Sequence, residues 1–126
     1  MPGSRYGWPK NILHWRGIEQ SIADINVAVR SGFAIVDGIE GMEGDGPLRG
    51  STVASGVLIM GENLTAVDAT AARVMGVCPE RVAHLNLMLA HGGTIAESRI
   101  RQLAEPVRAV RREFQLLNKF AYLRMS

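Results

Sequence analysis

Two short, continuous apolar runs constrain the fold of this chain most. "FAIV" (33–36) and "GVLIM" (56–60) contain no polar residue, which is typical of strands covered on both faces. Helical patterns follow the second run at residues 64–76, with Asn63 as the expected N-cap and Gly76 at the end, and at residues 79–93, with a proline in the first turn. Residues 107–123 also look helical. A helical stripe also precedes the first run, with spacings of four, three and four between Ile18, Ile22, Ile25 and Val29. This order predicts an α/β fold, with a short mixed or parallel sheet flanked by helices.

Length and composition favour one domain. The chain has 126 residues with no repeat or linker, so we expect a single α/β domain over residues 1–126. No apolar run approaches the ~20 residues of a membrane span, and the first ten residues lack the apolar core of a secretory signal. Cys78 is the only cysteine, so we expect neither an internal disulfide nor an iron–sulfur cluster held by this chain alone. We expect a cytoplasmic protein.

Charge is distributed unevenly along the chain. Residues 1–98 carry seven Lys/Arg and ten Asp/Glu, whereas residues 99–126 carry seven Lys/Arg and two Asp/Glu. We expect a basic, mainly helical tail over residues 99–126. Such a tail can contact nucleic acid, anionic lipid or an acidic partner. A solvated helix face is the more common explanation, and no RNA-binding or zinc-finger signature accompanies the tail.

The segment between the two apolar runs is rich in glycine and reads "IVDGIEGMEGDGPLRG" (35–50). We expect a loop over residues 38–50. It matches neither the P-loop nor the dinucleotide-binding spacing, and Pro47 removes a backbone N–H that a phosphate cradle would use. Arg49 could bind a carboxylate or phosphate through two hydrogen bonds. The acids could instead offer oxygen ligands to a hard cation, at Glu40, Glu43 and Asp45.

Two aspartates are the main candidates for chemistry. Asp37 ends the first apolar run, and ligands of α/β sheets gather where parallel strands end. It could bind metal, accept a proton or simply cap the following turn. Asp68 lies within the apolar stripe expected for helix 64–76, where a buried carboxylate needs a partner. That partner could be Arg49, a backbone N–H or a ligand, or Asp68 could be a structural acid near the helix start.

The histidines give weaker signals. His84 and His91 lie seven residues apart on one expected helix, or ~10 Å along its axis, which disfavours a shared metal. Each is more simply a packing or partly exposed residue. His14 stands near Trp15 and could donate a proton in a cleft or pack on indole rings. No serine or cysteine has an activating partner that spacing reveals.

Three stretches together resemble a known family. "YGWPKNILHWRGIEQSIADI", "IVDGIEGMEGDGPLRG" and "LIMGENLTAVDATAARVMGVCPERVAHL" resemble the C-terminal half of the domain-of-unknown-function family 362, from about residue 6 to about residue 117. The second and third stretches carry the most specific matches. The positions that match the family motif are Lys10, Asn11, His14, Asp37, Gly44, Gly46, Pro47, Gly50, Asp68 and Gly76.

The resemblance implies candidate site residues but no specific reaction. The family has no established general activity, but its members are often fused to or encoded near iron–sulfur modules, which implies redox or metal-linked chemistry. Catalytic candidates are therefore Asp37, Asp68 and His14, and metal candidates are Asp37 and Asp68. Candidates for ligand binding are Arg49, Gly44, Gly46, Gly50, Lys10 and Asn11. Whether the chain is an enzyme stays open, and a divalent metal is an open alternative.

The family domain is about twice as long as this chain, so a sheet shared with the missing half would expose a strand edge, and exposed edges recruit partners. We therefore expect a homo-oligomer or a partner chain. The favoured hypothesis is a remnant or half of a metal- or redox-linked enzyme domain that binds a small anionic molecule. The alternatives are a non-catalytic binding or assembly module that needs a partner chain, and nucleic-acid binding through the basic tail.

Overall fold

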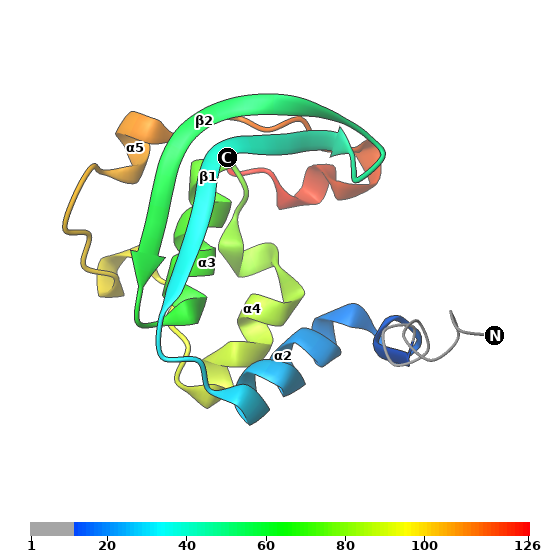
Figure 1. The fold of residues 1–126 in the computed structure, drawn as a ribbon, viewed down its shortest axis with the longest axis vertical. Coiled ribbons are helices and arrows are strands. Elements are labelled where there is room, and N and C mark those ends of the chain that lie inside the picture. Colours follow the sequence, from blue (N-terminus) through cyan, green and yellow to red (C-terminus); the bar gives the residue numbers. More distant parts are fainter. Residues whose placement is uncertain (1–11) are drawn as a thin grey trace, which may run out of the picture.

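The computed structural model describes residues 12–126. It shows a β-hairpin with helices that cover one of its faces (Figure 1). Residues 12–15 are helical and lead into the first full helix. The longer elements are α2 (Ile18–Val29), β1 (Ala34–Asp45), β2 (Arg49–Gly61), α3 (Leu64–Val74), α4 (Ala83–Met88) and α5 (Val107–Val110). Four 3₁₀ helices complete the described part, η1 (Pro79–Arg81), η2 (Leu89–His91), η3 (Glu97–Arg99) and η4 (Asn118–Leu123). The α/β class is confirmed.

The sheet differs from the predicted one. β1 and β2 form a two-stranded antiparallel hairpin, not a mixed or parallel sheet, and the loop predicted over residues 38–50 is mostly strand. Only residues 46–48 form the turn. A parallel pair would need a crossover of a dozen or more residues, so a three-residue connection permits only the antiparallel arrangement. Each strand keeps one edge without a neighbouring strand among residues 34–61.

The hairpin bends near its middle (Figure 1). The register shifts between Gly38 and Glu40, and Gly56 on the opposite strand has a φ of 67° that favours glycine. Beyond the bend, the hairpin packs on the C-terminal segment. A Cβ at Gly41 would lie 2.8 Å from the Phe114 ring, so only glycine lets this ring pack against the strand.

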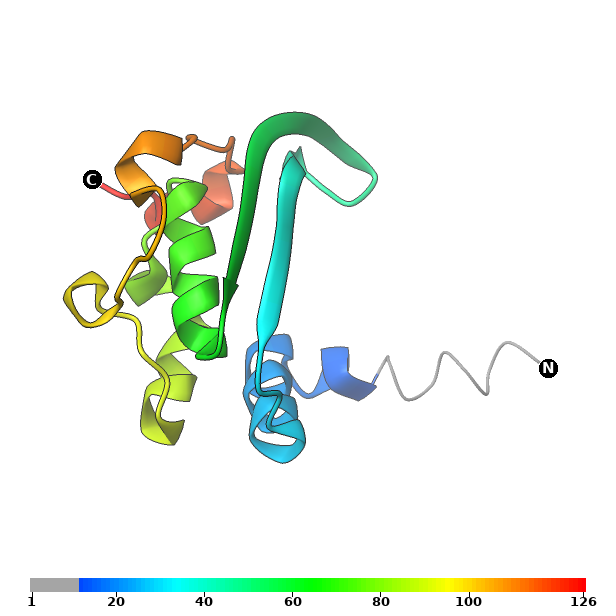
Figure 2. The ribbon, with the colours of Figure 1, turned by 60° about the vertical axis from the view of Figure 1, so that its left-hand side comes forward.

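Helix α3 follows the predicted boundaries closely and packs on the inner face of the hairpin (Figure 2). Its predicted N-cap is confirmed, because the backbone N–H of Ala66 donates to Asn63 Oδ1 at 3.0 Å. The predicted end at Gly76 is close to the observed one, and Gly76 has a φ of 76° just beyond the helix. The small core is centred on Ala69, Leu85 and Ile95.

Two predicted helices are interrupted, the first at local side-chain hydrogen bonds and the second at contacts with α3. The helix predicted over residues 79–93 is divided into η1, α4 and η2, and the Asn86 side chain donates to the carbonyls of Glu80 and Val82 at this break. The helix predicted over residues 107–123 is interrupted between α5 and η4, and the prediction of a mainly helical tail over residues 99–126 is wrong, because most of that segment is irregular. There the backbone N–H of Arg112 donates to Val74 O, and that of Phe114 donates to Met75 O, so contacts with the end of α3 replace helical hydrogen bonds.

Helix α2 forms where it was predicted, but it packs on α4 rather than on the hairpin. Within residues 12–126, no helix combines the length and the apolar character that a membrane crossing requires.

Candidate functional site

A polar cavity lies between α2, α3 and α4. Its volume is about 520 Å³, within the range of ~300–1,000 Å³ that small-molecule sites occupy. The loop between α2 and β1 and the loop after η2 also contribute to its lining. The residues that line it are Ile22, Asn26, Val27, Arg30, Ser31, Glu62, Asn63, Leu64, Thr65, Asp68, His84, Leu85, Met88, His91, Gly92 and Gly93.

His84, in this cavity, is held by a carboxylate from another helix. Glu19 in the first turn of α2 accepts a hydrogen bond from the backbone N–H of His84 at 2.9 Å, and the same oxygen, Oε2, lies 2.6 Å from His84 Nδ1. A carboxylate at Nδ1 favours the tautomer with its proton there and orients the ring. Nε2 is then left to accept a proton or hydrogen bond from a ligand.

Asp68 lies one turn into α3 and lines the same cavity. Asp68 is an exposed residue rather than the buried acid that the sequence predicted, and its carboxyl group receives no hydrogen bond from residues 12–126. Burial raises the pKa of Asp68, and the nearby His84 opposes this shift through its charge. A carboxyl group with a raised pKa beside an oriented imidazole is an arrangement that acid–base chemistry uses.

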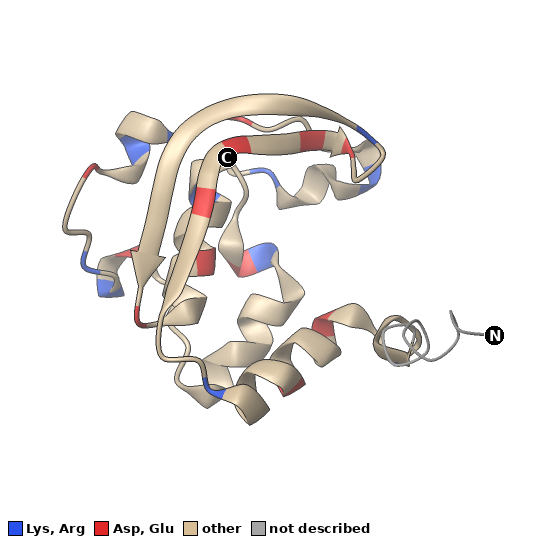
Figure 3. Cartoon of the chain, viewed as in Figure 1, with Lys and Arg blue, Asp and Glu red and all other residues tan. Residues whose placement is uncertain are grey.

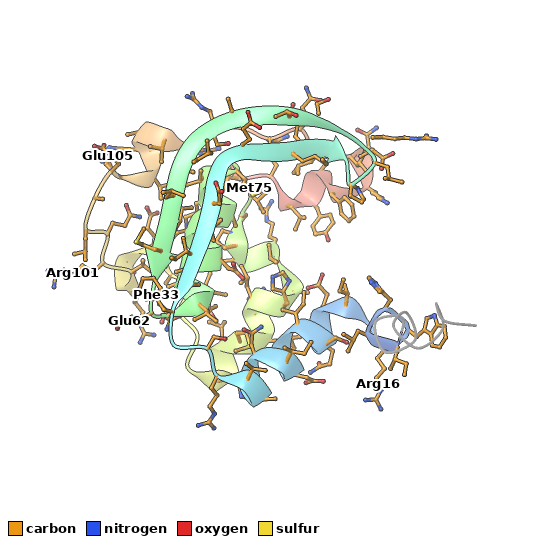
Figure 4. All side chains as sticks on the ribbon, viewed as in Figure 1. Arg16, Phe33, Glu62, Met75, Arg101 and Glu105 are labelled. Carbon is orange, nitrogen blue, oxygen red and sulfur yellow. The ribbon has the colours of Figure 1, made fainter. Side chains whose placement is uncertain are left out.

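The other polar residues of the cavity include more donors than acids. Arg30 and His91 add cationic or potentially cationic groups, whereas Glu62 adds one further acid. Glu62 lies at the foot of the hairpin, beside Phe33 (Figure 4). The neutral residues that can donate hydrogen bonds are Asn26, Ser31, Asn63 and Thr65. Such a donor set can hold an anionic group.

The sequence predicted that Asp37 lies at the end of a strand, but it lies within β1. It pairs with Leu58 in the middle of the strands, so the prediction that a strand ends at Asp37 is wrong. Its side chain is on the exposed face of the hairpin, where Oδ1 accepts a hydrogen bond from the backbone N–H of Ile39 at 3.1 Å. This local hydrogen bond is the structural role that short acidic side chains often have.

Arg49 lies away from both Asp37 and Asp68. It pairs with Asp45 beside the turn, eight residues along β1 from Asp37, or about 26 Å of strand. Neither Arg49 nor Asp37 lines the cavity that contains Asp68. Arg49 is therefore not the partner of Asp68, and the three candidate residues lie in three separate places.

The glycines predicted to bind a ligand lie around the turn of the hairpin. Gly44 pairs with Gly50, and Gly46 is in the turn. Gly44 has a φ of 77°, and its N–H donates to Gln115 O at 3.0 Å. A Cβ at Gly46 would lie 3.0 Å from Met42 Sδ, and one at Gly50 would also meet that side chain. Close packing thus gives a structural reason for these glycines, while their ligand role stays a prediction.

The remaining candidates lie outside the cavity or outside the described part. His14 belongs to the helical residues 12–15 and does not line the cavity. Lys10 and Asn11 lie outside the described residues. Glu19 was missed by sequence reasoning, and His84 was given only a packing role. No local signal could link them, because 65 residues separate the two.

A metal centre does not fit the described residues. Among residues 12–126, no group of three or more His, Cys, Asp or Glu side chains lies close enough together to hold a metal ion. The two predicted metal ligands, Asp37 and Asp68, lie on the outer face of the hairpin and in the cavity, respectively. They therefore do not form one shared site.

Comparison with known proteins gives one match. The model of the family described as "Domain of unknown function (DUF362)" matches residues 1–73, which is more than half of the chain. The chain belongs to this family. No curated protein and no solved structure matches it.

The family match covers only part of the candidate site. It includes α2, the hairpin and most of α3, and therefore Glu19 and Asp68. His84 and His91 lie beyond residue 73. The correspondence with the C-terminal half of the family domain stays a prediction.

Proposed function

We propose that this DUF362 protein binds a small anionic metabolite in the cavity between α2, α3 and α4. In this proposal His84 and Asp68 exchange a proton with the ligand. The observation that carries it is the placement of a Glu19-held imidazole and a carboxyl group of raised pKa in one cavity.

The donors of the cavity support an anion as the ligand. Arg30 can donate two parallel hydrogen bonds to a carboxylate or phosphate, and the neutral donors can complete its coordination. Asp68 works against an anion when ionised and with it when protonated, because the protonated carboxyl group is a donor. Its raised pKa therefore favours binding as the pH falls.

The proton-transfer step follows from the same geometry. His84 Nε2 can take a proton from a bound ligand, because Glu19 stabilises the positive charge that then forms on the ring. Asp68 can return a proton to the ligand. The metal- or redox-linked part of the family's expected chemistry would need donors other than the described residues, so it is not included in this step.

The assembly alternative has its own support, since the hairpin and α2 expose many large apolar side chains. The nucleic-acid alternative has less. Lysine and arginine residues are distributed over several C-terminal segments (Figure 3), and Arg111 pairs with Glu113 at 3.1 Å. A steep salt dependence of association would be the mark of nucleic-acid binding.

The test of the ligand site is amide chemical-shift mapping by NMR with inorganic phosphate, pyruvate and malate as probes. At least one probe should give saturable shifts around Arg30, Asn63, Asp68 and His84. His84→Gln should weaken that binding at least about tenfold, because it removes the oriented ring. Glu97→Gln, in η3 and outside the cavity, is the matched control and should bind normally. Shifts confined to residues 44–50, lost in Arg49→Ala, would place the site at the turn and overturn the proposal.

The pH dependence gives a second test. Because the pKa of Asp68 is raised, anion binding should strengthen as the pH falls through that pKa. Asp68→Asn should bind the same probe with little change over this range. A titration series between pH 4 and 7.5, on both variants, measures the difference. Equal pH dependence in both proteins would show that Asp68 does not face the ligand.

A further inference from the structure

The hairpin has a bare apolar face. Ile35, Ile39, Leu58 and Met60 are between 55 and 65 % exposed, and Ile35 pairs with Met60 across the strands. These side chains alternate with the half-buried positions that face α3, so they lie on the opposite side of the sheet. Figure 2 shows α3 against one side of the hairpin. We call this surface, which also includes Asp37, the outer face.

Helix α2 has a bare apolar side as well. Ile18, Ile25 and Val29 lie seven and four residues apart on one stripe of the helix and are between 45 and 66 % exposed. These three residues are called the α2 stripe. Ile22 lies between them on the same stripe but is half-buried, and with Asn26 it contributes to the lining of the cavity.

We propose that two copies of the chain associate, with the α2 stripe of each copy covering the outer face of the other's hairpin. A sheet face with apolar side chains is stable when a second layer covers it, and a helix with an apolar stripe is the usual layer in α/β proteins. Each copy has one of each surface. In a dimer with a two-fold axis, both surfaces of each copy are therefore covered at the same time, and no uncovered surface is left to bind a third copy.

The area available agrees with a stable dimer. The seven apolar side chains of the two surfaces expose roughly 750 Å² per copy, close to the ~800 Å² that each partner contributes to a standard interface.

Charge selects a helix rather than a second hairpin as the covering layer. Asp37 lies among the apolar side chains of the outer face, opposite Leu58. Two outer faces packed on each other would bring like charges together in an apolar setting, which is unfavourable. Helix α2 instead has Arg16 just before its start and Arg30 at its end (Figure 4 labels Arg16). A cation near either end of the helix can pair with Asp37 of the other copy.

The first test measures the oligomeric state by light scattering and sedimentation at 10–100 µM. The unmodified chain should be a dimer. Leu58→Glu on the outer face and Val29→Glu on the α2 stripe should each weaken association at least about tenfold. Leu48→Glu is the matched control, because Leu48 is 94 % exposed in the hairpin turn and outside both surfaces. Circular dichroism checks that each variant is folded. A monomeric unmodified chain, or a dimer that both variants leave intact, would overturn the proposal.

The second test determines which surfaces meet. In a Cys78→Ser background, one preparation carries Ile25→Cys and the other Leu58→Cys, and the two are mixed under mild oxidation. A mixed disulfide dimer should form much faster than either symmetric one. Leu48→Cys, at a position that is 94 % exposed in the hairpin turn, controls for random collision. Preferential cross-linking between two Leu58→Cys chains would show that the hairpins pack on each other and would contradict the helix-on-sheet arrangement.

Discussion

The inner and outer faces of the hairpin differ in how the chain covers them. On the inner side, α3 contributes buried residues such as Val67 and Val74, and Ala69 of the same helix forms a small core with Leu85 and Ile95. On the outer side, larger residues such as Ile35 and Leu58 remain exposed. A two-stranded sheet is only marginally stable without a layer against it. The inner face therefore stabilises the monomer, whereas the outer face is suited to a contact with another chain.

The largest expected effect is on the inner side. Arg73 is buried in α3, and its Nη2 donates to Ile95 O at 2.7 Å and to Glu80 Oε1 at 2.9 Å. Arg73→Ala should lower the free energy of unfolding by about 2–4 kcal/mol, because it leaves the Ile95 carbonyl without its donor and removes packed atoms. Urea denaturation measures the change. Glu80→Gln should cost much less, since Glu80 is half exposed. A loss below about 0.5 kcal/mol in Arg73→Ala would contradict the role of Arg73 in the core.

The next effect concerns the junction between the bent hairpin and the C-terminal segment. Gly41→Ala places a Cβ 2.8 Å from the Phe114 ring, so this buried ring has to move. We expect a loss of about 1–2 kcal/mol in the free energy of unfolding. Gly32→Ala is the control, because no atom lies within 4 Å of its added Cβ. Equal stability of the two variants would mean that Phe114 does not pack on β1.

A smaller effect, a gain in stability rather than a loss, is expected when Asp68 is replaced. Its pKa is raised in the folded state by burial, so its contribution to stability is greatest when it is protonated and is lost as the pH rises through the folded pKa. Asp68→Asn should therefore raise the melting temperature slightly at pH 7, and the difference should vanish near pH 3. Asp45→Asn, beside the hairpin turn, is the control. A fall at pH 7 would show that the attraction to His84 outweighs burial.

The smallest effect on the monomer is expected on the outer face. Ile35→Thr should change the free energy of unfolding by less than about 0.5 kcal/mol at concentrations where the chain is monomeric, because Ile35 is largely exposed there. Val36→Thr, the adjacent residue on the half-buried face, should cost more. Chemical denaturation at low micromolar concentration compares the two. A large loss in Ile35→Thr would mean that the outer face is covered within a single chain.

The elements predicted correctly depend on neighbours in the sequence. The spacing of four, three and four identified α2, and Asn63 and Gly76 marked the two ends of α3. The hairpin was missed because its glycines resemble a loop. Their spacing instead reflects the packing of Met42 and Phe114, which the sequence does not show. The C-terminal helix was overestimated for a related reason, since its backbone donates to the end of α3.

The candidate site shows the same division. Asp68 could be singled out from the sequence, because a carboxylate among apolar residues of a helix requires an explanation. Its neighbour His84 and the carboxylate of Glu19 could not be assigned to it, since side chains from three helices meet only after those helices pack. Sequence by itself determined the family, the α/β class and the helices with strong local signals. Tertiary structure decided the antiparallel hairpin, the position of the cavity and the bare outer face, because each depends on contacts between residues far apart in the chain.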